Sequence, residues 1–384
     1  MFLAANHSRA PLDCSIDMFT YVMSFFQVMA PFLDLVFAFG RQYLREDFYY
    51  TRFRHEHYLN SPNAKLNEFA IPQLGRSGKE YQQCYNLWSV ERPRVSGTPW
   101  SIRQTAFYHS FDVETGRALW VNVSPNFEIK SRIAQATSSH LSPGAETGKF
   151  ELFAATLTTH LITFEWSVEN WRAYISKLET DTRETLDTVN NIPVEDVEQV
   201  LAVDSGALLR PLLGRNNTSA TACQPPAPKT VVAADVLSST RKRTFSSLDL
   251  KSLPDKARST TVHVTEDIEE EDPFKNLNSL SFTTLQRLNH TLTLLRTAAL
   301  VMKLNKDILL GQIEYYEGLL IKDKYSELSD EFRAGCSVHT AEFCRRVRDL
   351  VSLLAMEQAR VDTLVVLLTD GRDLVSTYRR YSLA

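Results

Sequence analysis

The sequence predicts an α/β domain with a mixed sheet and helices, followed by a long α-helical hairpin that resembles a coiled-coil stalk, so that the chain is mostly α overall. Three observations predict this fold class. Apolar residues alternate with a period of two within residues 81–123, and they recur with a helical period over residues 150–190. From residue 285 onward they follow heptad spacing.

The composition limits the class of protein. Of 384 residues, 43% are hydrophobic and 10% are aromatic, which is ample for a hydrophobic core. The formal net charge of -4 gives no global basic field, so we expect no nucleic acid among the main partners. The five cysteines are scattered without a CxxC pair, which fits a reducing compartment. We expect the protein to lie in the cytoplasm, either free or at the cytosolic face of a membrane.

The first apolar segment, Met18–Phe39, is about long enough to cross a bilayer. It contains Gln27, Pro31 and Asp34, however, and an aspartate near the centre of a span costs roughly 2.5 to 3.5 kcal/mol. No other stretch of the sequence approaches the length of a span. We therefore expect no membrane span in this chain.

The same segment is interpreted as a buried helix, a turn and a buried strand. Ser15 or Asp17 would cap the helix, Pro31 would end it, and the strand would cover Phe32–Phe39. The polar stretch that follows, Arg41–Lys79, is interpreted as a long surface excursion.

A β-hairpin is predicted next. Ser101–Asp112 and Ala118–Val123 alternate as strands and flank a short turn in which Gly116 supplies the left-handed residue. The residues that share a face are Phe107, His109 and Phe111 on the first strand, and Leu119, Val121 and Val123 on the second.

One long helix is predicted from Phe150 to about Asn190. Its aromatic residues Trp166, Trp171 and Tyr174 could stack on a ligand, but packing on the sheet is the better interpretation. The α/β domain would then cover residues 12–200.

Apolar periodicity is lost over residues 204–272, which are rich in Ser, Thr, Ala, Pro and Lys and are predicted to be a disordered linker. The basic run Arg241–Arg243 precedes hydroxyl residues at positions 244, 246 and 247, a pattern that fits a kinase site or a nuclear address. A solvated charge cluster is the favoured interpretation of this run.

Residues 273–384 are predicted to form a stalk-like hairpin of two helices joined near Ser329–Gly335. The heptad positions are Leu285, Leu288, Leu292, Leu295, Ala299, Met302, Leu309, Ile313, Tyr316 and Leu320 in the first helix, and Phe343, Val347, Leu350, Leu354, Val361, Leu364, Leu368 and Val375 in the second. We expect these positions to be interaction faces within the chain and between chains, with self-association through residues 279–380. A closed monomer that buries both faces is the alternative.

No enzyme is expected. His109, Asp112 and Cys84 could be combined as base, orienting group and nucleophile, but no motif fixes their geometry. A histidine on an aromatic strand is more often a hydrogen-bonded core residue.

A metal or cofactor site is not expected either. His55 and His57 beside Glu56 give a possible pair of ligands for a divalent metal, but a third and a fourth ligand are missing. The sequence contains neither GxxxxGK[ST] nor a GxGxxG after a strand, so nucleotide binding has no support.

Five segments carry a resemblance to a known family: Ile16–Gly40, SIRQTAFYHSFDVETGRALWV (Ser101–Val121), THLITFEWSVENWRAYISKLE (Thr159–Glu179), FTTLQRLNHTLTLLRTAALVMKLNKDIL (Phe282–Leu309) and RVDTLVVLLTDGRDLV (Arg360–Val375). They resemble fungal proteins with a CorA-like transporter domain. The resemblance implies a cytosolic α/β domain followed by stalk helices, with Mg²⁺ as the transported ion. It also implies assembly with further copies or with full-length CorA-like membrane relatives.

Members of that family continue into two membrane helices and carry a Gly-Met-Asn triplet, whereas this sequence ends at Ala384 without either. The leading hypothesis is a non-catalytic, truncated or pore-less relative of a divalent-cation transporter that acts by binding and assembly. The alternative is an intracellular helical scaffold or adaptor whose linker is controlled by phosphorylation.

Overall fold

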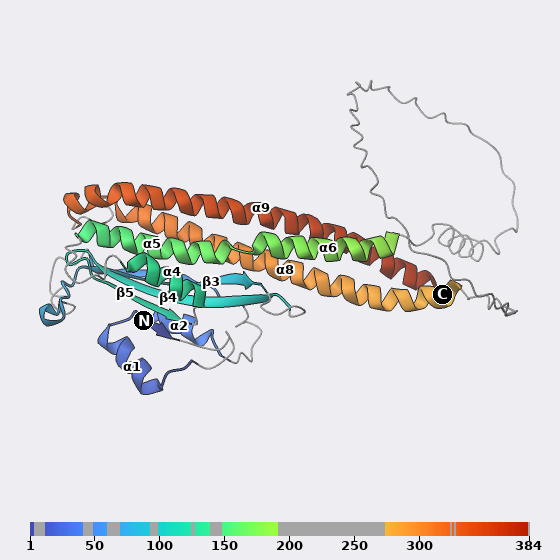
Figure 1. Ribbon diagram of the computed structural model, residues 1–384, viewed down its shortest axis with the longest axis horizontal. Coiled ribbons are helices and arrows are strands. Elements are labelled where there is room, and N and C mark those ends of the chain that lie inside the picture. Colours follow the sequence, from blue (N-terminus) through green and yellow to red (C-terminus); the bar gives the residue numbers. More distant parts are fainter. Residues whose placement is uncertain are drawn as a thin grey trace, which may run out of the picture. The chain divides into compact units, whose positions relative to one another are not determined.

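The computed structural model describes residues 1–3, 12–40, 49–59, 70–92, 99–123, 127–138, 148–190, 273–322, 325 and 328–382. Met1–Val194 and Asn278–Ala384 belong to one compact unit. The predicted fold class is confirmed, because a mixed sheet with helices is followed by two long helices (Figure 1). The linker 204–272 and its basic run lie outside the described residues, and the division into three domains stays a prediction.

The sheet has five strands in the order β1-β5-β4-β3-β2. Their bounds are Phe2–Leu3 (β1), Phe53–His57 (β2), Glu80–Glu91 (β3), Ser101–Asp112 (β4) and Ala118–Val123 (β5). β1 runs parallel to β5 and the other neighbours are antiparallel, so the sheet is mixed. The predicted hairpin is confirmed as β4 and β5, and Gly116 has the expected left-handed backbone, with φ +72°.

Helices cover one face of the sheet with a continuous hydrophobic core (Figure 1). They are α4 (Phe127–Thr137), α5 (Lys149–Val168), α6 (Trp171–Asn190), α8 (Pro273–Leu319) and α9 (Asp330–Ser382). α5 lies between β3 and α9, and the sheet residues Tyr85, Phe107 and Phe111 pack in the same core as both long helices. α5 and α9 approach each other closely at Gly335 of α9. A Cβ atom added there would lie 2.9 Å from the ring of Phe150 on α5.

The opposite face carries α1 (Ile16–Phe25) and α2 (Pro31–Phe37) over a second, smaller core. Phe32 and Leu35 of α2 pack there on Tyr108 and Val121 of the sheet. α1 begins at Ser15, whose hydroxyl accepts a hydrogen bond from the Met18 amide at 3.2 Å, so the predicted serine cap is confirmed.

Two predictions for this segment are wrong. Phe32–Phe39 is not a strand, because Pro31 occupies the first turn of α2 and the buried residues follow at helical spacing. Pro31 was predicted to end the first helix. Its fixed backbone angle instead suits the first turn of α2. α1 is also not buried, since none of its residues falls in the buried class.

Two further boundaries differ from the prediction. The helix expected over Phe150–Asn190 is broken after Val168, where Asn170 adopts a left-handed backbone with φ +65°. The stretch Arg41–Lys79 contains β2, which pairs with β3 instead of forming only a surface excursion. The hairpin joint lies just before α9, whose first turn is capped by the Ser329 hydroxyl, so Gly335 falls inside the helix.

Candidate functional site at the sheet–helix junction

A buried polar cluster joins the sheet to α5 and α8. The side-chain nitrogen of Gln83 on β3 lies 2.9 Å from Nε2 of His160 on α5, 2.8 Å from the Tyr316 hydroxyl on α8 and 3.3 Å from Nδ1 of His109 on β4. All four side chains are fully buried. Three elements that are distant in the sequence therefore meet at one amide group.

The cluster continues from His160 through Tyr85 on β3. Nδ1 of His160 lies 2.8 Å from the Tyr85 hydroxyl, which lies 3.2 Å from the Thr163 hydroxyl, and Thr163 donates to the carbonyl of His160 at 2.8 Å. Because the Gln83 amide donates to Nε2, the network assigns the proton of His160 to Nδ1. The hydrogen bonds then run in one direction from Gln83 to the backbone of α5.

Burial decides the charge of this cluster. It lowers the pKa of His109 to about 3. Burial first, and the neighbouring His109 second, hold the pKa of His160 well below its usual range. Both imidazoles are neutral at neutral pH, so the cluster holds the elements together by hydrogen bonding without buried charge.

The three residues considered as a catalytic set are not brought together. In the β3–β4 register His109 lies opposite Gln83 and Cys84 lies opposite Tyr108, so the Cys84 side chain faces the smaller core. Burial raises the pKa of the Cys84 thiol to about 12, which keeps it protonated. A nucleophile and base pair between Cys84 and His109 is therefore excluded by geometry.

Asp112 has a structural role in the turn after β4. Its carboxylate accepts hydrogen bonds from the amide and hydroxyl of Ser77 at 2.7 and 2.8 Å, and from the amides of Glu114 and Thr115 at 3.0 and 2.9 Å. The two bonds from Glu114 and Thr115 fix the turn that joins β4 to β5, and the two from Ser77 tie this turn to the segment before β3.

His55 and His57 share one side of β2 and face tyrosines. The ring centroids of His55 and Tyr315 are 4.6 Å apart, and those of His57 and Tyr325 are 4.7 Å apart. Glu56 points to the other side of the strand, next to Tyr58. Within the part of the chain that the structure describes, no group of three or more His, Cys, Asp or Glu residues could hold a metal ion.

A second buried contact joins α8 to the sheet. The Asn305 side chain accepts from the Trp88 amide at 3.0 Å and donates to the Trp88 carbonyl at 2.6 Å. The carboxamide thus pairs with the backbone of β3 as a peptide group of a neighbouring strand would. Asn305 is fully buried within the heptad series of α8.

The break between α5 and α6 is held by polar groups of the same junction. The carbonyl of Trp166 accepts from the Ser89 hydroxyl at 2.9 Å, and the carbonyl of Ser167 accepts from the Trp171 indole at 2.8 Å. These bonds satisfy two carbonyls at the C-terminal end of α5 that have no partner within the helix. The interpretation of Trp166, Trp171 and Tyr174 as core residues is confirmed by their burial.

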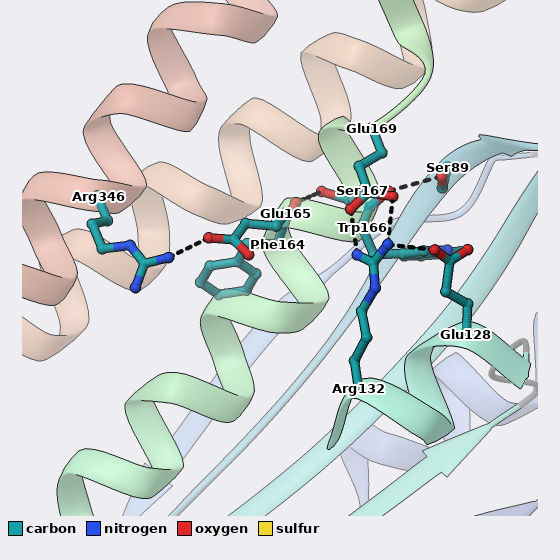
Figure 2. Close-up of polar contacts among 9 residues, drawn as sticks. All are labelled: Ser89, Glu128, Arg132, Phe164, Glu165, Trp166, Ser167, Glu169 and Arg346. Atoms are coloured by element: carbon teal, nitrogen blue, oxygen red, sulfur yellow. Dashed lines mark hydrogen bonds and ion pairs between the residues drawn. The ribbon is translucent and has the colours of Figure 1, made fainter. Parts of the chain in front are cut away.

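Ion pairs surround the same break (Figure 2). Arg132 on α4 pairs with Glu128 in its own helix and with Glu169 just after α5, while Glu165 on α5 pairs with Arg346 on α9. Partly exposed pairs of this kind contribute about 0 to 1 kcal/mol each. They tie α4, α5 and α9 together at one level of the bundle.

The predicted interaction faces lie inside this unit. Leu288, Leu292, Leu295, Met302, Leu309, Ile313, Tyr316, Leu354, Val361, Leu364 and Leu368 are buried, and Leu285, Leu320 and Leu350 pack against the same core. The faces therefore make contacts within the chain. Contact between chains stays a prediction.

Sequence reasoning missed Gln83, His160 and Asn305. Each is a polar residue inside an apolar series: Gln83 alternates with Tyr81 and Tyr85, and Asn305 lies in the α8 seam. A polar residue at a core position is the local signal, since buried polar groups need partners. Which partners they have depends on the tertiary structure.

Comparison with known protein families gives a match in the N-terminal part of the chain. Residues 1–190, just under half of the chain, match the family model CorA-like, described as CorA-like transporters. No curated protein and no solved structure matches the chain. None of the helices in the described part of the chain is both long and apolar enough to cross a membrane.

Proposed function

We propose, from the similarity of residues 1–190 to CorA-like transporters, that this chain is a non-catalytic component of a divalent-cation transport system with Mg²⁺ as its cargo. It acts by binding to membrane relatives of CorA type and by conformational coupling between its sheet and its long helices. The chain's own residues supply the coupling, and the transported ion passes through its partner.

The observation that carries this proposal is the double attachment of α8 to β3. Gln83 bonds to Tyr316, and Trp88 bonds to Asn305, at two points separated by about three turns of α8. Both bonds are buried, so neither exchanges freely with water. A displacement of the sheet is therefore passed to α8 instead of being absorbed between them.

The properties of His109 and Cys84 fit a non-catalytic role. His109 is a poor base at neutral pH because its pKa is about 3, and Cys84 faces away from it.

Assembly is proposed to involve residues 279–380. Their heptad side chains are buried within the chain, so a partner helix reaches them only if α8 or α9 exchanges between chains. The outward-facing residues of α9, such as Leu353, Met356 and Leu367, are exposed and offer contact without exchange.

The test is transport by a full-length CorA-like membrane protein in liposomes loaded with a magnesium-sensitive dye. The chain should bind the transporter and change the initial rate of Mg²⁺ entry at least twofold. Asn305→Ala should retain binding but lose most of the effect, because α8 is then less firmly coupled to β3. No binding and an unchanged rate would contradict the proposed function.

A second candidate is an intracellular scaffold with a phosphorylatable linker. It is favoured by the exposed apolar residues of the N-terminal layer, Met18, Tyr21 and Phe37 among them. Phosphorylation at positions 244, 246 and 247 would then change partner binding, measured by pull-down with the phosphorylated and unphosphorylated chain. An unchanged set of partners would exclude this alternative.

A further inference from the structure

Helix α1 presents more apolar surface than the sheet covers. Phe19 and Met23 pack against the smaller core. Met18, Tyr21 and Phe25 form a second apolar row beside them, at the i, i+3 and i+7 positions of one helix side. Their side chains are 48%, 66% and 38% exposed. The row is therefore uncovered in the single chain.

The row is held in place by an arginine. The rings of Tyr21 and Phe25 stack with centroids 5.7 Å apart, and the Arg76 guanidinium lies 5.5 Å from the centre of the Phe25 ring. Arg76 also donates to the Phe25 carbonyl at 2.7 Å and to the Gln27 side chain at 3.3 Å. The exposed rings thus have a fixed geometry at the C-terminal end of α1.

The two ends of the row carry opposite charges. Arg76 lies at the C-terminal end, where its charge also acts on the Glu80 carboxylate of β3. Asp17 lies in the first turn of α1, at the other end, and is exposed. No cation in the described part of the chain pairs with Asp17.

We propose that the Met18–Tyr21–Phe25 row binds the same row of a second copy of this chain, with the two α1 helices antiparallel about a two-fold axis near Tyr21. Antiparallel packing brings Asp17 next to the partner's Arg76, and the symmetry repeats that pair at the other end. Met18 then lies against the partner's Phe25. One contact thus covers the apolar row and brings Asp17 to Arg76 at both ends.

This charge pattern favours a second copy over a bilayer. A negatively charged membrane surface would repel Asp17, and peripheral helices usually carry several Lys or Arg residues, which α1 lacks. Three side chains bury far less than the roughly 800 Å² per partner of a standard interface. The association is therefore weak and depends on concentration.

The contact is independent of the proposed function, because α1 lies on the face of the sheet opposite α8 and α9 (Figure 1). Self-association through the long helices can fail while the α1 contact holds, and the reverse is also true. The experiment has to separate these two surfaces.

The test is sedimentation equilibrium of the full chain over a wide concentration range, with two charge-reversal variants. Asp17→Lys places two cations together at each end of the contact, and Arg76→Glu places two acids together, so each variant alone should be monomeric. In an equimolar mixture, a dimer of one copy of each variant pairs the introduced Lys with the introduced Glu at one end. It pairs Asp17 with Arg76 at the other end, so a dimer should return. Thr20→Lys, on the neighbouring polar side of α1, should associate like the wild type.

Thermal melting of each variant checks that the fold is retained. A wild-type chain that stays monomeric at the highest concentration would overturn the proposal, as would a mixture of variants that stays monomeric. A dimer that persists in both single variants would place the contact elsewhere, such as on the long helices. A monomer that floats with phosphatidylcholine vesicles would identify a membrane as the occupant instead.

Discussion

Asn305 on α8 forms two hydrogen bonds with the backbone of Trp88 on β3, although the two residues are 217 positions apart in the sequence. Trp88 lies opposite Gln104 of β4, but β2 pairs only with residues 81–85 of β3 and does not extend to it. The side-chain amide of Asn305 supplies the hydrogen bonds that β2 does not. The contact sets the position of α8 along the sheet. It is comparable to a buried asparagine that specifies register in a coiled coil.

Removing this amide should destabilise the protein strongly. Asn305→Ala leaves the buried amide and carbonyl of Trp88 without their partner, and each unsatisfied group costs about 1 to 3 kcal/mol. We expect a loss of about 2 to 4 kcal/mol in the free energy of unfolding, measured by urea denaturation. The exposed Asn289→Ala on the same helix should change stability by less than about 0.5 kcal/mol. Equal effects of the two substitutions would contradict the assigned role.

Stability should depend on pH through the buried histidines. Their folded-state pKa values lie below the unfolded value of about 6.5, with His109 at about 3. The unfolded chain therefore binds more protons between these limits. The contribution is complete above about pH 6.5 and is lost as the pH falls towards 3, by up to about 1.4 kcal/mol per pH unit for each histidine.

The measurement is urea denaturation between pH 5 and pH 7, compared with two variants. His109→Gln should be less stable at pH 7 but should flatten the pH dependence. His339→Gln, at an exposed position on α9, is the control for the replacement of a histidine by glutamine. If His109→Gln and the wild type had the same slope, the neutral state assigned to His109 would be wrong.

The stability of the protein should depend on which residue occupies position 170, in the break between α5 and α6. Asn170 has φ +65°, a conformation that asparagine and glycine tolerate and β-branched residues do not. Asn170→Gly should stay within about 0.5 kcal/mol of the wild type, whereas Asn170→Val should cost about 1 to 3 kcal/mol. Thermal or urea unfolding compares the two. A stable valine variant would show that α5 and α6 can join into one continuous helix.

Trypsin should cut the chain first within residues 204–272, where the composition predicts too little apolar content to offset the entropy of ordering. The shared core of the sheet, α5, α8 and α9 should then keep the two fragments together. We expect two bands on a denaturing gel but one peak in native size-exclusion chromatography. Separate elution of the fragments would show that the shared core is too weak to hold them.

Local patterns predicted much of the fold. The β4–β5 hairpin follows from alternation and Gly116, and most of the heptad residues of α8 and α9 are buried as their spacing indicates. The CorA-like resemblance is supported over residues 1–190 by the family match. Its extension to the C-terminal segments and a fungal origin stay predictions.

Other features had no decisive local signal. Phe32, Leu35 and Val36 fit both a short strand and a helix, and Pro31 fits both a helix end and a helix start. The break at Asn170 lies in a helical pattern without proline or glycine. The Gln83 cluster depends on contacts across as many as 233 residues, which no periodic pattern encodes.

The central claim is that the sheet and the long helices form one coupled body, and native-state hydrogen exchange tests it most directly. Amides of β3 and β4 and those of α8 near Asn305 should open with the same free energy as urea is raised, because their core and hydrogen bonds are shared. Asn305→Ala should lower that free energy in the sheet and in α8 together. Opening of α8 at a clearly lower free energy than the sheet, in the wild-type chain, would contradict coupling between them.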